Sequence, residues 1–311
     1  MKPTTSRQNS GLLSAAAVGV SLLVGGLAAL LVGRSGETPA LIPPGTLLAQ
    51  FQIEEGTDRM RHRLPGRLQE ISGLARVPAG LLLAHDDERA RLHRLDAGAG
   101  EVVDEFGLDE DGMRGDFEGV AVGGGFVYLT DSDGVIRVFP EGAPDARVPF
   151  ETLDTGVGER CEVEGLAFVA DPARLLLACK RIRMEGLRGG LTVFTVPLGA
   201  SGAEAPEPFL DLAPEALSAL GLPRRLSLSG LEVHEDTGHM VVIASREGRI
   251  VEIGRDGSIL AWARLRSGPH PQPEAITFTE NGDLAIGDEG SGGSARLTVY
   301  PRQSDEPGGG S

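Results

Sequence analysis

The sequence predicts an all-β fold, a β-propeller of five blades that follows an N-terminal transmembrane helix, with six blades as the alternative. Three observations lead to this prediction. Gly and Pro supply 45 and 20 of the 311 residues, which favours turns and short strands over long helices. A carboxylate or serine followed by a small residue and an apolar run occurs five times along the chain. A long segment without a charged residue lies near the N-terminus.

The charge-free segment spans 11–33 and is long enough, at ~1.5 Å per residue, to cross the ~30 Å core of a bilayer. Because Lys2 and Arg7 precede it, we expect a single-pass anchor in the cytoplasmic membrane with the body on the periplasmic or extracellular side. Secretion after signal cleavage is the alternative, although the run exceeds the usual ~7–15 apolar residues and no clean A-x-A site follows. We therefore assign 1–34 to the anchor and the Pro-containing 35–44 to a stiff linker.

The repeats fill 45–302, the predicted propeller domain, and a flexible tail follows at 303–311. In each repeat the small motif leads into an apolar strand, a tight turn, a second strand that ends in polar residues, and a third strand. Four short antiparallel strands per repeat of roughly 40–50 residues are typical of a propeller blade. The motifs are "ISGLA" at 71–75, "FEGVA" at 117–121, "VEGLA" at 163–167, "LSGLE" at 228–232 and "PEAIT" at 273–277.

The ring is expected to be closed by an N-terminal strand. The segment "GTLLAQFQI" at 45–53 matches "GSILAWARL" at 257–265, a predicted outer strand, in length and pattern. The last repeat ends at Tyr300 after three strands, so the upstream segment is predicted to supply its missing outer strand and leave no free edge. Between the third and fourth repeats, "APEALSALGLP" at 213–223 predicts a short helix with Pro at its start.

The ordered set of five motifs resembles the SdiA-regulated (YjiK-like) family, and single motifs are similar to those of NHL-repeat and phytase-like propellers. The resemblance covers 45–302. It implies a five-bladed propeller with a calcium site and a membrane-anchoring N-terminus, in a family whose biochemical activity is largely undefined.

The first strand of each blade lines the channel of a propeller, where Gly or Ala lets neighbouring backbones approach. The residue before the small residue is then expected to point toward the axis at one mouth. Carboxylates that meet there repel one another unless a cation, bound protons or basic neighbours compensate. The five positions are Ser72, Glu118, Glu164, Ser229 and Glu274.

The ends of the second strands add a second ring of polar residues at the same mouth. Converging carboxylates suit Ca²⁺, which takes about six to eight oxygen ligands. The expected ligands are Glu118, Glu164 and Glu274, with Asp131 and Asp86 as further candidates and Glu70 as a substitute for Ser72. Carboxylates that bind only water, or that pair with Lys180 and Arg246, are the alternative. The second ring comprises Asp86, Asp131, Lys180, Arg246 and Glu289, with Asp87, Asp133 and Asp288 adjacent.

Five other residues are singled out by their rarity or placement. Cys161 and Cys179 are the only cysteines and are candidates for a disulfide in an exported protein. His234 and His239 bracket a turn and are expected to form a surface pair across the hairpin. Trp262, the only tryptophan, is expected to pack between blades from an outer strand.

The net charge is −16, and the first 34 residues hold three bases and no acid, so the rest of the chain carries 26 bases and 45 acids. An acidic body disfavours nucleic acid. Since P-loop, G-x-S-x-G and H-E-x-x-H motifs are missing from the sequence, we expect a monomeric calcium-binding propeller that recognises a small molecule or envelope protein rather than an enzyme. The alternatives are a metal-dependent hydrolase, phytase-like or lactonase-type, and a structural scaffold of the cell envelope.

Overall fold

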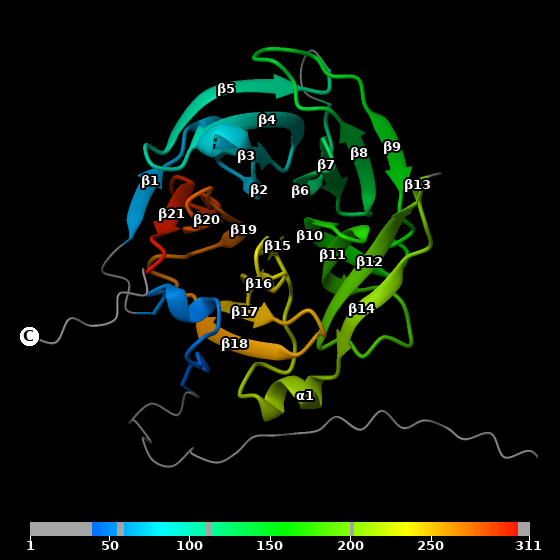
Figure 1. Ribbon diagram of the computed structural model, residues 1–311, viewed down its shortest axis with the longest axis vertical. Coiled ribbons are helices and arrows are strands. Elements are labelled where there is room, and N and C mark those ends of the chain that lie inside the picture. Colours follow the sequence, from blue (N-terminus) through cyan, green and yellow to red (C-terminus); the bar gives the residue numbers. More distant parts are fainter. Residues whose placement is uncertain (1–38, 55–58, 110–112, 200–201, 304–311) are drawn as a thin grey trace, which may run out of the picture. The chain divides into compact units, whose positions relative to one another are not determined.

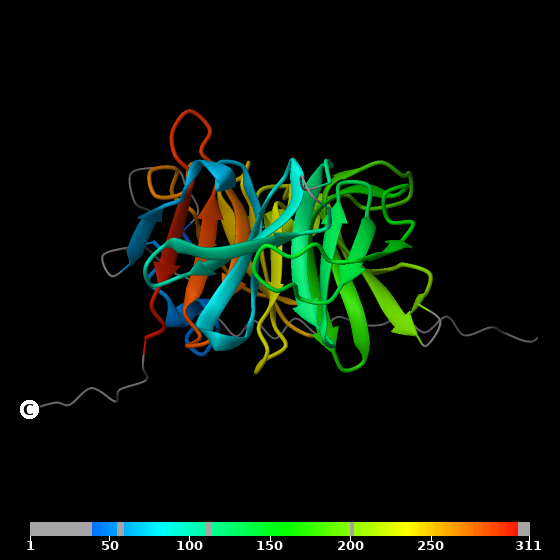
Figure 2. The same cartoon turned by 90° about the horizontal axis from the view of Figure 1, so that it is seen from above.

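The structure, a computed structural model, describes residues 39–54, 59–109, 113–199 and 202–303. Its strands form five antiparallel sheets, which surround a common centre as the blades of a propeller (Figure 1). Figure 2 shows the ring edge-on, with the strands running between its two faces. The predicted five-bladed all-β architecture is confirmed.

The expected membrane span at 11–33 lies outside the described residues. Within the described ranges, the structure contains no helix of the length and apolarity that a bilayer crossing requires.

The blades follow one another in chain order, each built from the centre outward. Blade 1 contains β2 (Ile71–Arg76), β3 (Leu81–Asp86), β4 (Arg89–Asp96) and β5 (Glu101–Gly107). Blade 2 contains β6 (Phe117–Gly123), β7 (Phe126–Asp131), β8 (Val135–Phe139) and β9 (Glu151–Asp154). Blade 3 contains β10 (Cys161–Ala170), β11 (Ala173–Ile182), β12 (Leu191–Gly199), β13 (Gly202–Ala203) and β14 (Glu207–Leu212). Blade 4 contains β15 (Gly230–Val233), β16 (Met240–Ala244), β17 (Arg249–Ile253) and β18 (Ile259–Arg264). Blade 5 contains β19 (Pro273–Phe278), β20 (Leu284–Asp288), β21 (Arg296–Tyr300) and β1 (Met60–Arg63).

Helical structure in the described residues is limited to short pieces. The predicted helix between blades 3 and 4 is confirmed as α1 (Pro214–Ala219), with Pro at its first position. The 3₁₀ turns are η1 (Leu48–Gln50), η2 (Gly66–Leu68) and η3 (Pro78–Gly80).

The inner strands β2, β6, β10, β15 and β19 each pack against the next, and β19 packs back against β2, so the ring is closed at its centre. The hydrophobic core is divided into clusters that lie between neighbouring blades. One cluster joins Leu74 and Leu82 of blade 1 to Ala285 and Leu297 of blade 5. Because every blade buries both faces against its neighbours, no single blade can be stable alone.

An N-terminal strand completes blade 5 as expected, but the predicted segment was wrong. The closing strand is β1, which pairs antiparallel with β21 from Met60↔Val299 to Arg63↔Arg296. Residues 45–53 instead form η1 and irregular backbone. The physical reason is burial: β1 reads MRHR and is largely exposed, so it carries no apolar pattern that would identify it as a strand.

The apolar side chains of 45–53 fill the wedge between blades 4 and 5. Leu48 and Phe51 are buried there beside Ile243 and Ile286. The backbone N–H of Leu48 donates to the carboxylate of the buried Glu252 at 2.9 Å. The apolar pattern that resembled an outer strand therefore serves packing between blades.

Trp262 is buried on the outer strand β18, as predicted. Its indole N–H donates to the carbonyl of Leu220 at 3.0 Å, which holds the segment after α1 against blade 4. Its backbone forms a bridge with Leu41, in the segment expected to be a linker.

Candidate functional site

The recurring motif marks a β-bulge at the start of the inner strands. In blade 2, Phe117 pairs with Asp131 and Gly119 with Thr130, so Glu118 is skipped by the ladder. Ser72 is skipped in blade 1 and Glu274 in blade 5 in the same way, and the register also shifts across Glu164 in blade 3. A bulge re-aims the side chain of the extra residue. The sequence motif thus places a carboxylate or hydroxyl at the same mouth in blade after blade.

The small residue of the motif is required by the neighbouring blade. A Cβ on Gly119 would lie 2.9 Å from the backbone N of Leu166, and one on Gly165 would lie 3.0 Å from that of Leu231. The expected close approach of inner strands is therefore confirmed at both positions. A cavity of only about 10 Å³ remains along the axis, lined by Glu118, Glu274 and the residues that follow them.

The structure brings Glu118, Glu164 and Glu274 together around one base. Lys180 Nζ lies 2.8 Å from Glu164 Oε1, and its positive charge also acts on Glu118 and Glu274. Ser72 donates to Glu118 at 2.8 Å. Glu164 and Glu274 are both buried, with exposed fractions of 4% and 8%. Three carboxylates thus share a single ammonium, the alternative foreseen for Lys180.

Burial keeps protons on these carboxylates. Burial, reinforced by the charge of Glu164, raises the pKa of Glu118 to about 9. Burial and the charge of Glu289 raise the pKa of Glu274 to about 8. Burial also raises the pKa of Glu164, although its hydrogen bond to Lys180 opposes the rise. At neutral pH the group therefore holds protons as well as Lys180, which limits the repulsion between its members.

A second acidic group lies beside the first, on blade 1. One oxygen from each of Glu70, Asp86 and Asp87 lies within 4.8 Å of the others, a spacing compatible with ligation of one metal ion. Burial raises the pKa of Asp87 to about 6, and the charges of Glu70 and Asp86 add to the rise. Glu289 joins this group to the first, because burial and the charges of Asp87 and Glu70 raise its pKa to about 7.

Asp87 supplies an oxygen whose surroundings are incomplete. Its Oδ1 is buried and has no hydrogen-bond partner among the described residues. Such an atom costs free energy unless a donor or a cation reaches it. Glu70 is exposed and Asp86 and Asp87 are half-buried, so solvent and ions have access to the group.

The remaining predicted residues serve their own blades. Asp131 accepts hydrogen bonds from the backbone of Asp133 and Val135 and pairs with Arg137 at 2.7 Å, so both of its oxygens are used within the β7–β8 turn. Ser229 donates to the carbonyl of Pro273 at 2.8 Å and links blade 4 to blade 5. The structure brings neither residue into the two acidic groups.

Asp288 is likewise drawn away from the channel. It is fully buried and contacts His270 Nδ1 at 2.8 Å, while His270 Nε2 contacts the hydroxyl of Tyr300 at 2.7 Å. This series of contacts from Asp288 through His270 to Tyr300 crosslinks the strands of blade 5. Arg246 is exposed in the turn after β16. The roles of His270 and Tyr300 were missed because their partners are far apart in sequence.

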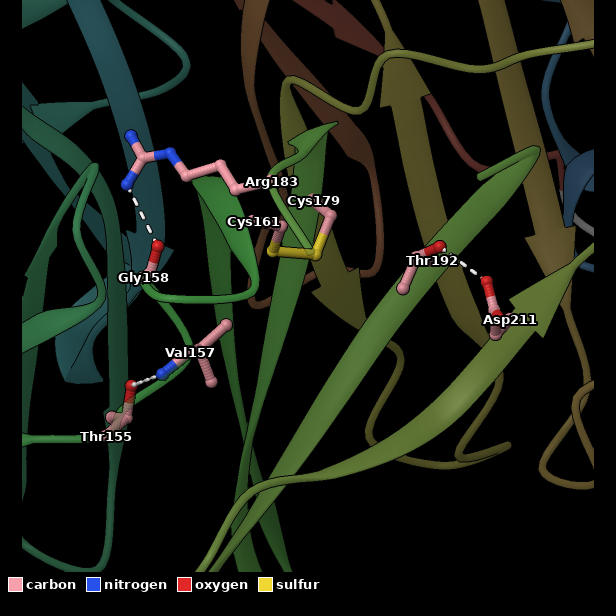
Figure 3. The surroundings of a disulfide bond; sticks show 8 residues. All are labelled: Thr155, Val157, Gly158, Cys161, Cys179, Arg183, Thr192 and Asp211. Carbon is pink, nitrogen blue, oxygen red and sulfur yellow. Dashed lines mark hydrogen bonds between the residues drawn. A yellow bond between two sulfur atoms is a disulfide. The ribbon is translucent and has the colours of Figure 1, made fainter. Parts of the chain in front are cut away.

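Cys161 and Cys179 form a disulfide between β10 and β11, with their Cα atoms 5.7 Å apart (Figure 3). Lys180 follows directly in the sequence, so the crosslink lies at the acidic mouth. Near it, Arg183 donates to the carbonyl of Gly158 at 3.0 Å and pairs with Asp133 of blade 2 at 2.6 Å. The end of blade 3 is thereby fixed to the blade before it.

His234 and His239 pair across the hairpin as expected, because the backbone N–H of His234 donates to the carbonyl of His239 at 2.9 Å, but the expected surface pair of side chains was wrong. His234 is buried and packs edge-on against Phe278, with ring centroids 4.9 Å apart. His239 turns to Glu252, 2.7 Å away. The two rings therefore contact different partners. The hairpin pattern in the sequence does not reveal these contacts.

Fold and site together define a five-bladed propeller with an acidic channel mouth. The family model described as SdiA-regulated matches residues 221–304, so the resemblance predicted from the motifs is confirmed over blades 4 and 5. A search of curated proteins found no match.

Several solved structures show a similar arrangement at low identity. A glutaminyl cyclase from Myxococcus xanthus is 14% identical with a TM-score of 0.49, covering 78% of this chain and 96% of that one. A gluconolactonase from Xanthomonas campestris is 14% identical with a TM-score of 0.48, covering 85% and 95%. An aldose sugar dehydrogenase from Streptomyces coelicolor, in its PQQ-bound form, is 15% identical with a TM-score of 0.46, covering 78% and 98%. Likeness at this level says nothing about the activity of this chain.

Proposed function

We propose that the protein is a membrane-anchored, extracytoplasmic propeller that binds Ca²⁺ at its acidic mouth and there recognises a small molecule or an envelope protein. The observation that carries the calcium site is the group formed by Glu70, Asp86 and Asp87, whose oxygens lie within 4.8 Å of one another. The buried, unpartnered Oδ1 of Asp87 is an oxygen that a cation would satisfy. The donor set, made only of carboxylates, suits a hard cation.

Calcium fits this group better than magnesium or zinc. The three residues come from the start of β2 and the end of β3 and reach the mouth with solvent on one side, so water can complete six to eight ligands, the usual range for Ca²⁺. Magnesium requires a tighter octahedron, and no histidine or thiol is present in the group to favour zinc. Glu70, Asp86 and Asp87 would hold the ion, which would supply positive charge to an anionic or hydroxyl-bearing ligand.

Glu118, Glu164 and Glu274, the ligands expected from the sequence, take a different part in this proposal. Lys180 already supplies a positive charge to them, and protons bound to Glu118 and Glu274 neutralise the remaining negative charge. They would lie next to the ion as a largely protonated group around Lys180, which the charge of Glu289 links to Glu70 and Asp87. Their substitution is therefore expected to weaken calcium binding less than substitution of Asp87.

A calcium-dependent phosphoesterase would need several bases directed at the ion to hold phosphate. The bases nearest the mouth are engaged with acids: Lys180 with Glu164, Arg181 with Glu162 and Arg183 with Asp133. This arrangement favours cation binding over phosphate chemistry.

The test is calcium titration of the purified full-length chain by calorimetry and by thermal melting with and without EDTA. We expect the melting temperature to rise with Ca²⁺, since a ligand that binds only the folded state stabilises it. Asp87→Asn is expected to lower calcium affinity at least about 10-fold, equivalent to ~1.4 kcal/mol. Glu101→Gln, an exposed change on the outer strand β5, is the matched control and is expected to bind as the parent does.

A protein whose melting temperature is the same in Ca²⁺ and EDTA would contradict the calcium site. An unchanged affinity in Asp87→Asn would place the ion elsewhere. The membrane anchor has a separate test: the full-length chain is expected in the membrane fraction, with the propeller open to protease only from the outer side of the cytoplasmic membrane. Recovery of the whole chain in the soluble fraction would contradict that part.

A further inference from the structure

The opposite end of the ring holds a much larger cavity, of about 850 Å³, within the range of ~300–1,000 Å³ typical of small-molecule sites. It is built from the far ends of the inner strands and the hairpin turns that follow them. Its lining includes Val122 and Phe168 from blades 2 and 3, Glu232 from blade 4 and Phe278 from blade 5. Ser72 and Arg76 are four residues apart on β2, so the two mouths are separated by ~13 Å along this strand.

One side chain distinguishes this cavity chemically. At the position two residues after the small residue of each motif, the inner strands carry Ala75, Ala121, Ala167, Glu232 and Thr277. Glu232 is thus the only ionisable residue at this level of the five inner strands. It is half-buried and lines the cavity.

The carboxylate of Glu232 is held by neutral donors. Thr277 donates its hydroxyl to Oε2 at 2.7 Å, and the backbone N–H of Val233 donates to Oε1 at 2.8 Å. Four arginines also line the cavity: Arg76, Arg174, Arg255 and Arg302. Arg76 pairs with Glu235 and Arg255 donates to the carbonyl of Thr237. Among the described contacts, therefore, no cation is bonded to this carboxylate.

A carboxylate in such a place lacks a partner of opposite charge. Burial raises the pKa of Glu232 to about 7, and the charge of Glu235 adds to the rise while Thr277 and Arg76 oppose it. A ligand ammonium would restore the charge balance and gain a charge-assisted hydrogen bond, which is stronger than a neutral one. The net charge of −16 also draws cations toward the protein and repels anions.

Aromatic rings line the same cavity as this carboxylate. Phe168 lines the cavity and stacks on Tyr128, with centroids 5.7 Å apart, so its orientation is fixed. Phe209 and Phe278 line it as well. Rings of this kind attract organic cations through their faces and bury an apolar body.

We infer that this cavity is a second ligand site, separate from the acidic mouth, and that it takes a small organic cation: an ammonium group on Glu232, with an apolar body against Phe168 and Phe278. The site does not depend on calcium. It would let the ring bind a metal ion at one face and an amine at the other.

The experiment compares three probes with the same apolar body on the full-length chain in EDTA: 2-phenylethylamine, 2-phenylethanol and 3-phenylpropionate. Calorimetry or ligand-observed NMR is expected to show that the amine binds at least about 10-fold more tightly than the alcohol, a difference of ~1.4 kcal/mol, and that the anion does not bind. Glu232→Gln is expected to remove the preference for the amine, whereas Glu232→Asp keeps part of it. Phe168→Ala is expected to weaken all binding several-fold. Glu280→Gln, an exposed acid at the rim, is the matched control and is expected to bind the amine as the parent does.

Equal affinity for the three probes, tighter binding of the propionate, or no binding at all would overturn the inference. So would an unchanged preference for the amine in a Glu232→Gln protein that melts cooperatively. If that variant does not fold, the relative affinities of the three probes for the parent chain still test the inference. Loss of amine binding on addition of Ca²⁺ would show one shared site and would also contradict the inference.

Discussion

The two mouths of the channel are made by the same five strands, yet they differ in chemistry. At the start of the inner strands the ladder skips Ser72, Glu118 and Glu274, and the carboxylates gather around Lys180 and beside Asp87. At the other end, regular pairing resumes, alanines occupy most of the equivalent positions, and Glu232 is the one ionisable residue among those positions, at the edge of a large cavity. The bulges at the start of the inner strands bring charged side chains together, whereas the regularly paired ends of the same strands border an open cavity.

The largest expected effect comes from the disulfide that supports only the acidic mouth. Replacing both Cys161 and Cys179 with Ala removes a crosslink across 18 residues and is expected to lower the free energy of unfolding by ~3 kcal/mol. Urea unfolding of the double variant measures this. Because Lys180 follows Cys179, calcium binding should weaken while amine binding at the other mouth persists. Stability equal to that of the parent would show that the crosslink does not hold this region.

The second prediction concerns the close packing of the inner strands between the two mouths. Gly119→Ala would place a Cβ 2.9 Å from the backbone of Leu166 and force inner strands apart, at a cost of ~1–3 kcal/mol in the free energy of unfolding. Gly66→Ala is the control, since a Cβ there meets nothing within 4 Å. Denaturant midpoints of the two variants give the comparison. Equal midpoints would mean that the inner strands have more room than the structure shows.

The pH dependence of stability distinguishes the buried carboxylates of the acidic mouth. The folded-state pKa of Glu118 is about 9, above its ordinary value of 4.5, so the folded state binds a proton that the unfolded state releases between these values. Its contribution to stability is present below pH 4.5 and is lost as the pH rises toward 9. Glu118→Gln is therefore expected to raise the melting temperature of the metal-free protein at pH 8 by at least ~2–4 °C and to leave it unchanged at pH 4. Melting curves at the two pH values test this, and a fall at pH 8 would contradict it.

The smallest expected effect concerns a carboxylate near the mouth but outside the site. Asp131→Asn breaks the pair with Arg137 and is expected to cost ~1 kcal/mol of stability. Calcium affinity should stay within about 2-fold of the parent, because both oxygens of Asp131 are used within its own turn. A loss of affinity comparable to that of Asp87→Asn would enlarge the metal site to include blade 2.

The repeats predicted the ring because each motif combines local signals: a small residue, an apolar strand and a tight turn. The convergence of Glu118, Glu164 and Glu274 followed from the same repetition. Interactions between distant residues were not predictable. The exposed strand β1 has no apolar pattern, Asp288 is drawn to His270, and Glu232 lies within an otherwise ordinary motif. The Glu70, Asp86 and Asp87 group depends on the pairing of β2 with β3, which sets their oxygens side by side.

The most direct test of the central claim, a calcium ion at the acidic mouth, is a crystal structure of the protein grown in Ca²⁺ with anomalous data to locate the ion. We expect an anomalous peak at ~2.3–2.6 Å from carboxylate oxygens of Glu70, Asp86 and Asp87. A mouth without such a peak, with Lys180 as the sole positive charge among the acids, would contradict it.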